Sequence, residues 1–239
     1  MQARRAGGRQ VSLRRYAWKK RSRDERYTKY NEGYPINSKL SDVELASFPC
    51  SYSTAENLLT RANVIANEVV LVTGASGGVG SAAVQLAKAR GARVFGIASL
   101  SKSDRVLSLG AEQTLSRNDS ILKELGRNSV DVVIDLVGGK QWPDLLEVLK
   151  PFGRYAVAGA IAGAFVELDV RNLYLKDLSL FGCTVLDESV FGNLVKRIET
   201  EEISPVVSST FPLSQVVEAQ KQFETKQHVG KLVIDLSIG

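Results

Sequence analysis

The chain has 239 residues, of which 44% are hydrophobic and 24% charged, with a formal net charge of +5 and a pI near 9.2. This globular composition excludes wholesale disorder and a collagen-like structure. No apolar run approaches the roughly 20 residues of a membrane-spanning helix, so we expect no membrane partner. Two cysteines, Cys50 and Cys183, cannot form a disulfide framework, which favours a cytoplasmic location.

The positive charge is concentrated at the N-terminus. Residues 1–30 contain eleven Lys and Arg residues, and their only acidic residues are Asp24 and Glu25, which gives a net charge of +9. The remaining residues therefore carry a net charge of −4. The basic pI is a property of this leading stretch and gives little support to nucleic acid as a partner of the rest of the chain.

Residues 1–33 have few aliphatic side chains and no hydrophobic period, so we predict a basic disordered tail. A mitochondrial transit peptide is an alternative, because the stretch is rich in Arg and free of acidic residues through Arg23. A nucleic-acid contact that uses Tyr16 and Trp18 is a further alternative, which we rank last.

From Val69 onward the pattern predicts alternating strands and helices, because short apolar runs alternate with segments of helical period. The predicted strands are Val69–Gly74, Arg93–Ala98, Val130–Val137, Tyr155–Ala160 and Leu178–Thr184. The predicted helices are Gly78–Arg90, a segment that begins at a Ser101/Asp104 capping box and is closed by Gly110, Ile121–Leu125, Trp142–Lys150 and Val190–Thr200. This alternation indicates an α/β fold with a doubly wound parallel sheet of the Rossmann type.

The last part of the chain breaks this alternation. Its pattern predicts a strand, a helix and a strand at Val206–Phe211, Gln215–Phe223 and Lys231–Leu236. We therefore divide the chain into a basic tail (residues 1–33), a short leading segment (34–60), a dinucleotide-binding domain (61–203) and a C-terminal segment (204–239).

A glycine-rich turn, Thr73-Gly74-Ala75-Ser76-Gly77-Gly78-Val79-Gly80, links the first predicted strand to its helix. Glycines let a backbone approach a pyrophosphate, whose charge is stabilised by the free N–H groups at the start of the helix. A Walker A loop is excluded because Ser81 and Ala82 follow Gly80, where that loop has Lys. The turn therefore indicates dinucleotide binding.

The spacing of this turn is similar to that of short-chain dehydrogenases, which catalyse with a downstream Tyr-x-x-x-Lys pair. The single such pair here, Tyr16 and Lys20, lies upstream in the predicted tail. The chain from about Tyr34 onward instead resembles the medium-chain dehydrogenase/reductase superfamily, in its alcohol dehydrogenase and quinone reductase branches. The segments that carry this resemblance are Leu40–Asp42, Ala46–Ala55, Ala75–Gly80, Asp135–Gly139, Phe223 and His228–Val233.

This resemblance implies an oxidoreductase that transfers a hydride between NADPH and a carbonyl, an enone or a quinone. It assigns the pyrophosphate to Gly77, Gly78, Val79 and Gly80. It also assigns Thr54 to a position near the nicotinamide, although helix capping would equally explain a threonine there.

Four residues end later predicted strands at the carboxyl edge of the sheet, where such sheets bind ligands. They are Val137, Gly138, Gly159 and Ala160. Turn chemistry also explains the two glycines. We interpret Asp135 as a buried strand residue that holds a loop, with no chemical role.

The choice of cofactor depends on the end of the second predicted strand. NAD-selective sites place an acidic residue there for the ribose hydroxyls, whereas here no acidic residue occurs before Asp104. Ser99 and Lys102 are placed to bind and neutralise a ribose phosphate. The sequence therefore favours NADP over NAD, and Arg105 would assist or lie on a solvated helix face.

In zinc-containing members of the superfamily a catalytic ligand occupies the position of Cys50. Zinc needs further protein ligands, and residues 1–33 supply neither Cys nor His. We therefore expect no zinc in this chain alone and interpret Cys50 and Cys183 as buried small residues. The only histidine, His228, is interpreted as a packing residue.

The superfamily's N-terminal GroES-like domain has no counterpart in residues 1–33. The resemblance thus implies a truncated member whose C-terminal segment lacks its usual packing partner and exposes strand edges. A non-catalytic NADP-binding domain is the alternative function. We identify neither an acid–base catalyst nor a particular substrate, and we expect a homodimer through Leu178–Thr184.

Overall fold

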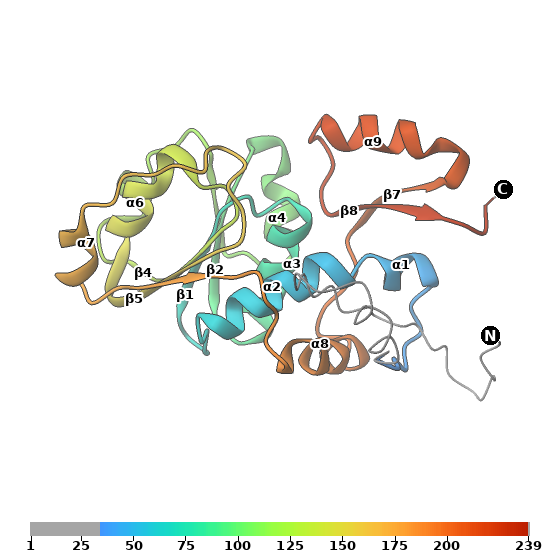
Figure 1. The fold of residues 1–239 in the computed structure, drawn as a ribbon, viewed down its shortest axis with the longest axis horizontal. Coiled ribbons are helices and arrows are strands. Elements are labelled where there is room, and N and C mark those ends of the chain that lie inside the picture. The colour runs from blue at the N-terminus through green and yellow to red at the C-terminus, as the bar shows by residue number, and fades with distance from the viewer. Residues whose placement is uncertain (1–33, 239) are drawn as a thin grey trace, which may run out of the picture.

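Six parallel strands form the central sheet of the computed structural model, which describes residues 34–238 (Figure 1). They are β1 (Val69–Val72), β2 (Arg93–Ala98), β3 (Gln113–Ser116), β4 (Val130–Asp135), β5 (Leu149–Val157) and β6 (Ser179–Gly182). Their order across the sheet is β3-β2-β1-β4-β5-β6, and every neighbouring pair is parallel. This arrangement confirms the predicted doubly wound sheet.

Helices cover both faces of the sheet (Figure 1). The first face carries α2 (Pro49–Arg61), α3 (Gly78–Ala89), α4 (Ser103–Ser108) and α8 (Ser189–Glu199). The second face carries α5 (Ile121–Leu125), α6 (Trp142–Glu147) and α7 (Val170–Tyr174). Within residues 34–238 no helix is both long and apolar enough to cross a bilayer.

Strand β1 explains why these strands are apolar throughout. Val70 and Val72 pack into the core of the first face, and Val69 and Leu71 pack into the core of the second. Because alternate side chains point to opposite faces, a central strand that is covered on both sides has no solvent-facing position. The continuous apolar runs in the sequence follow from this burial.

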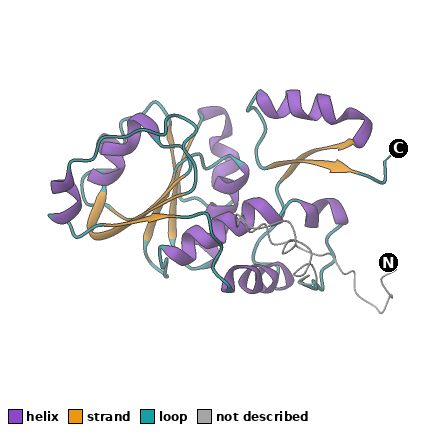
Figure 2. Ribbon diagram, viewed as in Figure 1, coloured by secondary structure: helices purple, strands orange, loops and turns teal. Residues whose placement is uncertain are grey.

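The C-terminal segment forms a separate unit of two parallel strands (Figure 2). Strand β7 (Val207–Pro212) is followed by the 3₁₀ turn η4 (Leu213–Gln215), α9 (Val216–Glu224) and β8 (Lys231–Asp235). The predicted strand-helix-strand extension is therefore confirmed. Its two strands pair with each other, and β8 also contacts the short helix α1 (Asp42–Ala46).

The structure corrects one predicted helix start. Ser101 lies in the 3₁₀ turn η2 (Leu100–Lys102), and α4 begins after it without a side-chain cap, so the predicted Ser101/Asp104 capping box is wrong. The Ser101 hydroxyl instead lies 3.4 Å from that of Ser99. A true capping box occurs at α1, where Ser41 and Glu44 bond to each other's backbone N–H groups.

Other differences concern short or irregular elements. The sequence pattern did not predict β3, α1, α2 or α7, and it placed the start of β5 at Tyr155, six residues after Leu149, where the strand begins. Within β5, Phe152 is 72% exposed and has a left-handed φ of +63°, which is uncommon in a strand. The predicted tail, with its transit-peptide and nucleic-acid alternatives, lies outside the described residues.

Candidate functional site

The glycine-rich turn leaves the start of α3 open. Gly77 caps the helix in an extended conformation, and no side chain accepts a hydrogen bond from the first N–H groups. Gly74 turns the backbone with a φ of +60°, and its carbonyl accepts the N–H of Gly77 at 3.0 Å. An uncapped N-terminus of a twelve-residue helix presents free N–H groups and a positive dipole end, which favour an anion.

Close packing explains two glycines of this turn. A Cβ atom on Gly80 would lie 2.1 Å from the carbonyl oxygen of Gly74, so a side chain there would displace the turn. A Cβ on Gly78 would lie 2.7 Å from Ser51 Oγ and 3.0 Å from Lys231 Cδ. A Cβ on Gly77 would make only an ordinary contact, at 3.4 Å, so packing within the protein does not explain Gly77.

Asp135 holds the carboxyl edge of the sheet together from within the core. Its side chain is fully buried and accepts the hydroxyl hydrogens of Thr73, at 2.5 Å, and of Tyr155. It also accepts the backbone N–H groups of Val137, at 2.9 Å, and Gly138, at 3.1 Å. The interpretation of Asp135 as a buried residue that holds a loop is therefore confirmed.

Tyr155 belongs to the same network. Burial raises the pKa of its phenol far above the usual range, and the neighbouring Asp135 carboxylate raises it further. The phenol therefore stays protonated and donates to Asp135 at every physiological pH. The contact ties β5 to the end of β4 without providing a titrating group.

The loops that follow β4 and β5 close against each other. Gly138 forms an isolated bridge with Gly163, and a Cβ on Gly138 would lie 2.7 Å from the Gly163 oxygen. A Cβ on Gly159 would lie 2.5 Å from the Leu136 oxygen. Val137, Gly138, Gly159 and Ala160 thus lie together at the carboxyl edge, and close backbone packing explains the two glycines. A hollow of about 300 Å³ adjoins these loops, lined in part by Trp142 and Phe165.

The two residues assigned to a ribose phosphate lie just after β2. Ser99 precedes η2, and Lys102 ends it. Lys102 Nζ donates to the carbonyl oxygens of Lys226, at 2.6 Å, and His228, at 3.0 Å. Burial lowers the pKa of Lys102, and the charge of Arg117 lowers it further.

The structure corrects the capping alternative for Thr54 and the predicted burial of Cys50, which both lie in α2. Thr54 lies inside this helix and donates to the carbonyl of Cys50 at 2.8 Å, so it is not a helix cap. Cys50 is exposed at the second position of α2, and the prediction that it is buried is wrong; Cys183 is buried as predicted. Among residues 34–238 no three His, Cys, Asp or Glu side chains are grouped to hold a metal, so these residues do not fit a zinc site.

Sequence reasoning missed how the C-terminal segment is fastened to α2 and α3. Tyr52 donates to the carbonyl of Ser204 at 2.7 Å, and Gln85 donates to the Tyr52 hydroxyl at 2.9 Å. The N–H of Ser204 donates to Gln85 Oε1 at 2.8 Å, which completes a ring of three hydrogen bonds. These residues are far apart in the chain, and nothing in the sequence near them predicts that they form hydrogen bonds with one another.

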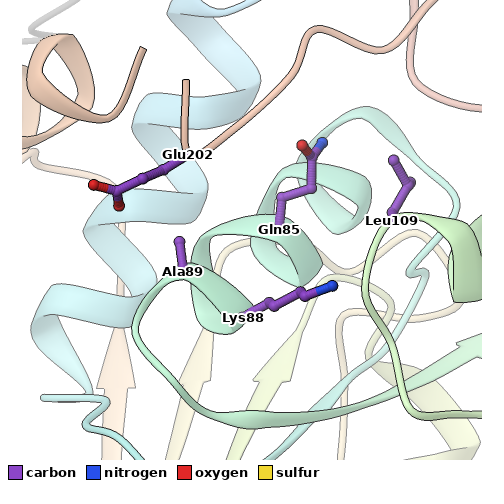
Figure 3. A pocket seen from close by; sticks show the side chains of 5 residues that line it. All are labelled: Gln85, Lys88, Ala89, Leu109 and Glu202. Atoms are coloured by element: carbon purple, nitrogen blue, oxygen red, sulfur yellow. The ribbon is translucent and has the colours of Figure 1, made fainter. Parts of the chain in front are cut away.

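Another hollow, of about 320 Å³, lies along the C-terminal half of α3 (Figure 3). It is lined by Gln85, Lys88, Ala89, Leu109 and Glu202. Lys88 and Ala89 are the last two residues of α3, at the end opposite the glycine-rich turn. This hollow is therefore separate from the carboxyl edge, and we assign it no part in the site.

Comparisons with known proteins show which family the chain is similar to. The family model described as "Zinc-binding dehydrogenase" matches residues 78–200. The chain is 30% identical to the acryloyl-coenzyme A reductase of Metallosphaera sedula, over 83% of this chain and 60% of the relative. It is also 30% identical to the quinone oxidoreductase of Rattus norvegicus, over 85% of this chain and 66% of the relative. The chain therefore spans about 60 to 66% of the length of these two curated relatives.

Solved structures of dehydrogenases and reductases are also similar to this chain. A candidate alcohol dehydrogenase from Sinorhizobium meliloti 1021 is 46% identical, with a TM-score of 0.80 over 85% of this chain and 58% of that chain. A thermostable alcohol dehydrogenase from Pyrobaculum aerophilum is 32% identical, with a TM-score of 0.73 over 84% and 60%. The quinone oxidoreductase from Coxiella burnetii is 30% identical, with a TM-score of 0.72 over 85% and 63%.

The geometry at Gly80 predicts that Gly80→Ala abolishes dinucleotide binding, because the added methyl group displaces the turn from the start of α3. Isothermal titration with NADP⁺ measures this loss. Gly192→Ala is the matched control, since Gly192 lies inside α8 with open space around its Cβ position. We expect the control to bind normally and to be more stable by about 0.5–1 kcal/mol. Normal binding by Gly80→Ala would contradict the assignment.

Proposed function

Because the chain belongs to the medium-chain zinc-binding dehydrogenase and quinone oxidoreductase family, we propose that it is an NADP-dependent oxidoreductase. The reaction is hydride transfer between NADPH and a carbonyl, an enone or a quinone. The observation that supports this most is the uncapped start of α3 behind a turn in which Gly80 has no room for a side chain. Such a turn at the carboxyl edge of a parallel sheet fits the pyrophosphate of a dinucleotide.

When bound, the nicotinamide supplies the hydride chemistry, and the protein supplies binding and orientation. The backbone N–H groups of Gly78, Val79 and Gly80 would hold the pyrophosphate, while Gly77, whose N–H is bonded to the Gly74 carbonyl, shapes the turn. Thr54 would lie toward the nicotinamide end. The strand-end residues Val137, Gly138, Gly159 and Ala160 form the floor of the crevice. The Asp135 network keeps this floor in place before any ligand arrives.

The preference for NADP follows from the residues after β2. Ser99 offers a hydroxyl, and Lys102 offers an ammonium that two carbonyl oxygens hold in position. An ammonium has three N–H donors, so one donor of Lys102 is left for a phosphate. No carboxylate lies between Ala98 and Asp104 to bind the ribose hydroxyls of NAD.

We predict that NADPH raises the melting temperature about 3 to 6 °C more than NADH at equal concentration, since about tenfold tighter binding adds about 1.4 kcal/mol. The variants Ser99→Ala and Lys102→Gln should each reduce this difference. Equal shifts for the two nucleotides in the unaltered chain would contradict the NADP preference.

Turnover separates this function from its alternative. We expect the chain to oxidise NADPH, followed by absorbance, with at least one substrate from a panel of quinones, enones and aldehydes. Binding of NADPH with no turnover on this panel, with or without added zinc, would instead support a non-catalytic NADP-binding domain.

A homodimer through Leu178–Thr184 is part of this proposal. Strand β6 lies at one end of the sheet, and among residues 34–238 no strand pairs with its outer edge. Exposed apolar side chains lie before and after it in the chain, with Leu175 70% and Val185 75% exposed. An edge strand with apolar neighbours favours pairing with a second copy.

We predict that the full chain sediments as a dimer and that Leu180→Glu combined with Val185→Glu makes it a monomer, because charges would be buried in the interface. Leu213→Glu, at a residue that is 58% exposed in η4, is the control and should stay dimeric. A monomeric unaltered chain would overturn the proposal.

A further inference from the structure

The hollow of about 300 Å³ between the loops that follow β4 and β5, which we call the loop hollow, lies outside the proposed cofactor site. Lys140 and Trp142 line it from the first loop and the start of α6. Phe165, Val166 and Glu167 line it from the second loop. None of the residues assigned to the cofactor lines this hollow. Trp142 belongs to the core of the second face, whereas α3 packs on the first.

The base of the loop hollow is closely packed backbone. Gly139 and Gly163 line it, and both have a positive φ, of +73° and +153°. A Cβ atom on Gly139 would lie 2.8 Å from the carbonyl oxygen of Ala162, and one on Gly163 would lie 3.3 Å from Gly139 Cα. The two loops therefore meet without side chains between them, and this contact fixes the spacing of the side chains above it.

Two opposite charges line the loop hollow without a partner in the part of the chain that the structure describes. Lys140 and Glu167 are both exposed. No ion pair between residues 34 and 238 includes either of them, so they do not pair with each other. Neither side chain forms a hydrogen bond with another described residue. Opposite charges that line one hollow without touching leave room for a ligand that carries both charges.

The remaining walls are aromatic or apolar. Trp142 is 9% exposed, and its indole packs against Tyr155 in a T-shaped arrangement with ring centroids 4.8 Å apart. The Trp142 Nε1–H is buried without a hydrogen-bond partner, a cost that an oxygen acceptor would recover. Phe165 is 99% exposed and Val166 is 40% exposed, so apolar surface beside the hollow is uncovered. The walls therefore suit a ligand with an apolar body and an acceptor oxygen.

We propose that the loop hollow binds a small zwitterion with an apolar body, which is the chemistry of an apolar α-amino acid. Its carboxylate lies beside Lys140 and accepts the N–H of Trp142, and its ammonium lies beside Glu167. Its apolar body covers Phe165 and Val166. The volume of the hollow is at the lower end of the range of small-molecule pockets, which suits a ligand of this size. This site is independent of the proposed function, and its occupant ties the loops after β4 and β5 together.

Calorimetric titration of the full chain with three ligands tests the proposal. L-phenylalanine carries both charges, 3-phenylpropionate carries only the carboxylate, and 2-phenylethylamine carries only the ammonium. Since each analogue loses one charged interaction at a partly exposed site, we expect each to bind about five- to tenfold more weakly than L-phenylalanine.

Charge-neutral variants separate the two ends of the ligand. Lys140→Gln should weaken L-phenylalanine and 3-phenylpropionate about fivefold and leave 2-phenylethylamine unchanged, and Glu167→Gln should spare 3-phenylpropionate instead. Phe165→Ala, at a fully exposed position, should weaken all three. The matched controls are Lys123→Gln and Glu124→Gln, which remove the same charges from exposed positions of α5 and should change nothing.

Three results would overturn this inference. They are no binding of any of the three ligands, equal affinities for all three, and an equal loss for both single-charge ligands in Lys140→Gln or Glu167→Gln. Loss of L-phenylalanine binding at saturating NADP⁺ would also overturn it, because the hollow would then belong to the cofactor crevice. Each variant's unfolding midpoint without ligand shows that it folds. NADP⁺ titration of the same chain tests the proposed function separately.

Discussion

The carboxylate of Asp135 lies fully buried at the end of β4, and the carboxyl edge of the sheet depends on it. A buried carboxylate is stable only when hydrogen bonds replace the water it has lost. Here the hydroxyls of Thr73 and Tyr155 and the N–H groups of Val137 and Gly138 supply those bonds. One side chain thereby joins the ends of β1, β4 and β5, where the strands surround the proposed cofactor crevice.

The C-terminal segment is hydrogen-bonded to the α/β domain at both of its ends. The hydrogen-bonded ring of Tyr52, Gln85 and Ser204 fixes where this segment leaves the α/β domain. Its other end returns over the carboxyl edge, through Lys102 and the glycine-rich turn. These contacts join residues that are more than a hundred positions apart in the chain, such as Tyr52 with Ser204 and Lys102 with Lys226.

Patterns of local origin could be predicted from the sequence. The apolar runs of the central strands follow from burial on both faces, and the glycine-rich turn follows from the backbone path into α3. The role of Asp135 was also predictable, since a lone acid at the end of an apolar strand requires partners. The omitted strand β3 has only two buried residues, Leu115 and Ser116, so its pattern is weak.

Contacts between distant segments could not be predicted. Nothing near Lys102 in the chain indicates that its ammonium binds the carbonyls of Lys226 and His228. Cys50 was predicted to be buried because residues 1–33 supply no further zinc ligands, whereas only the orientation of α2 shows that it faces solvent. Contacts between residues that are far apart in the chain depend on how the fold packs. Composition and hydrophobic periodicity indicate only local structure.

The most direct test of the central role of Asp135 is hydrogen exchange in Asp135→Asn, together with NADP⁺ titration. The substitution keeps the size of the side chain but replaces one acceptor oxygen with a donor that opposes Tyr155 or Gly138. We predict faster exchange at Leu136, Val137 and Gly138, a free energy of unfolding lowered by about 2 kcal/mol or more, and weaker NADP⁺ binding. Unchanged exchange at these three amides with unchanged NADP⁺ affinity would contradict the account.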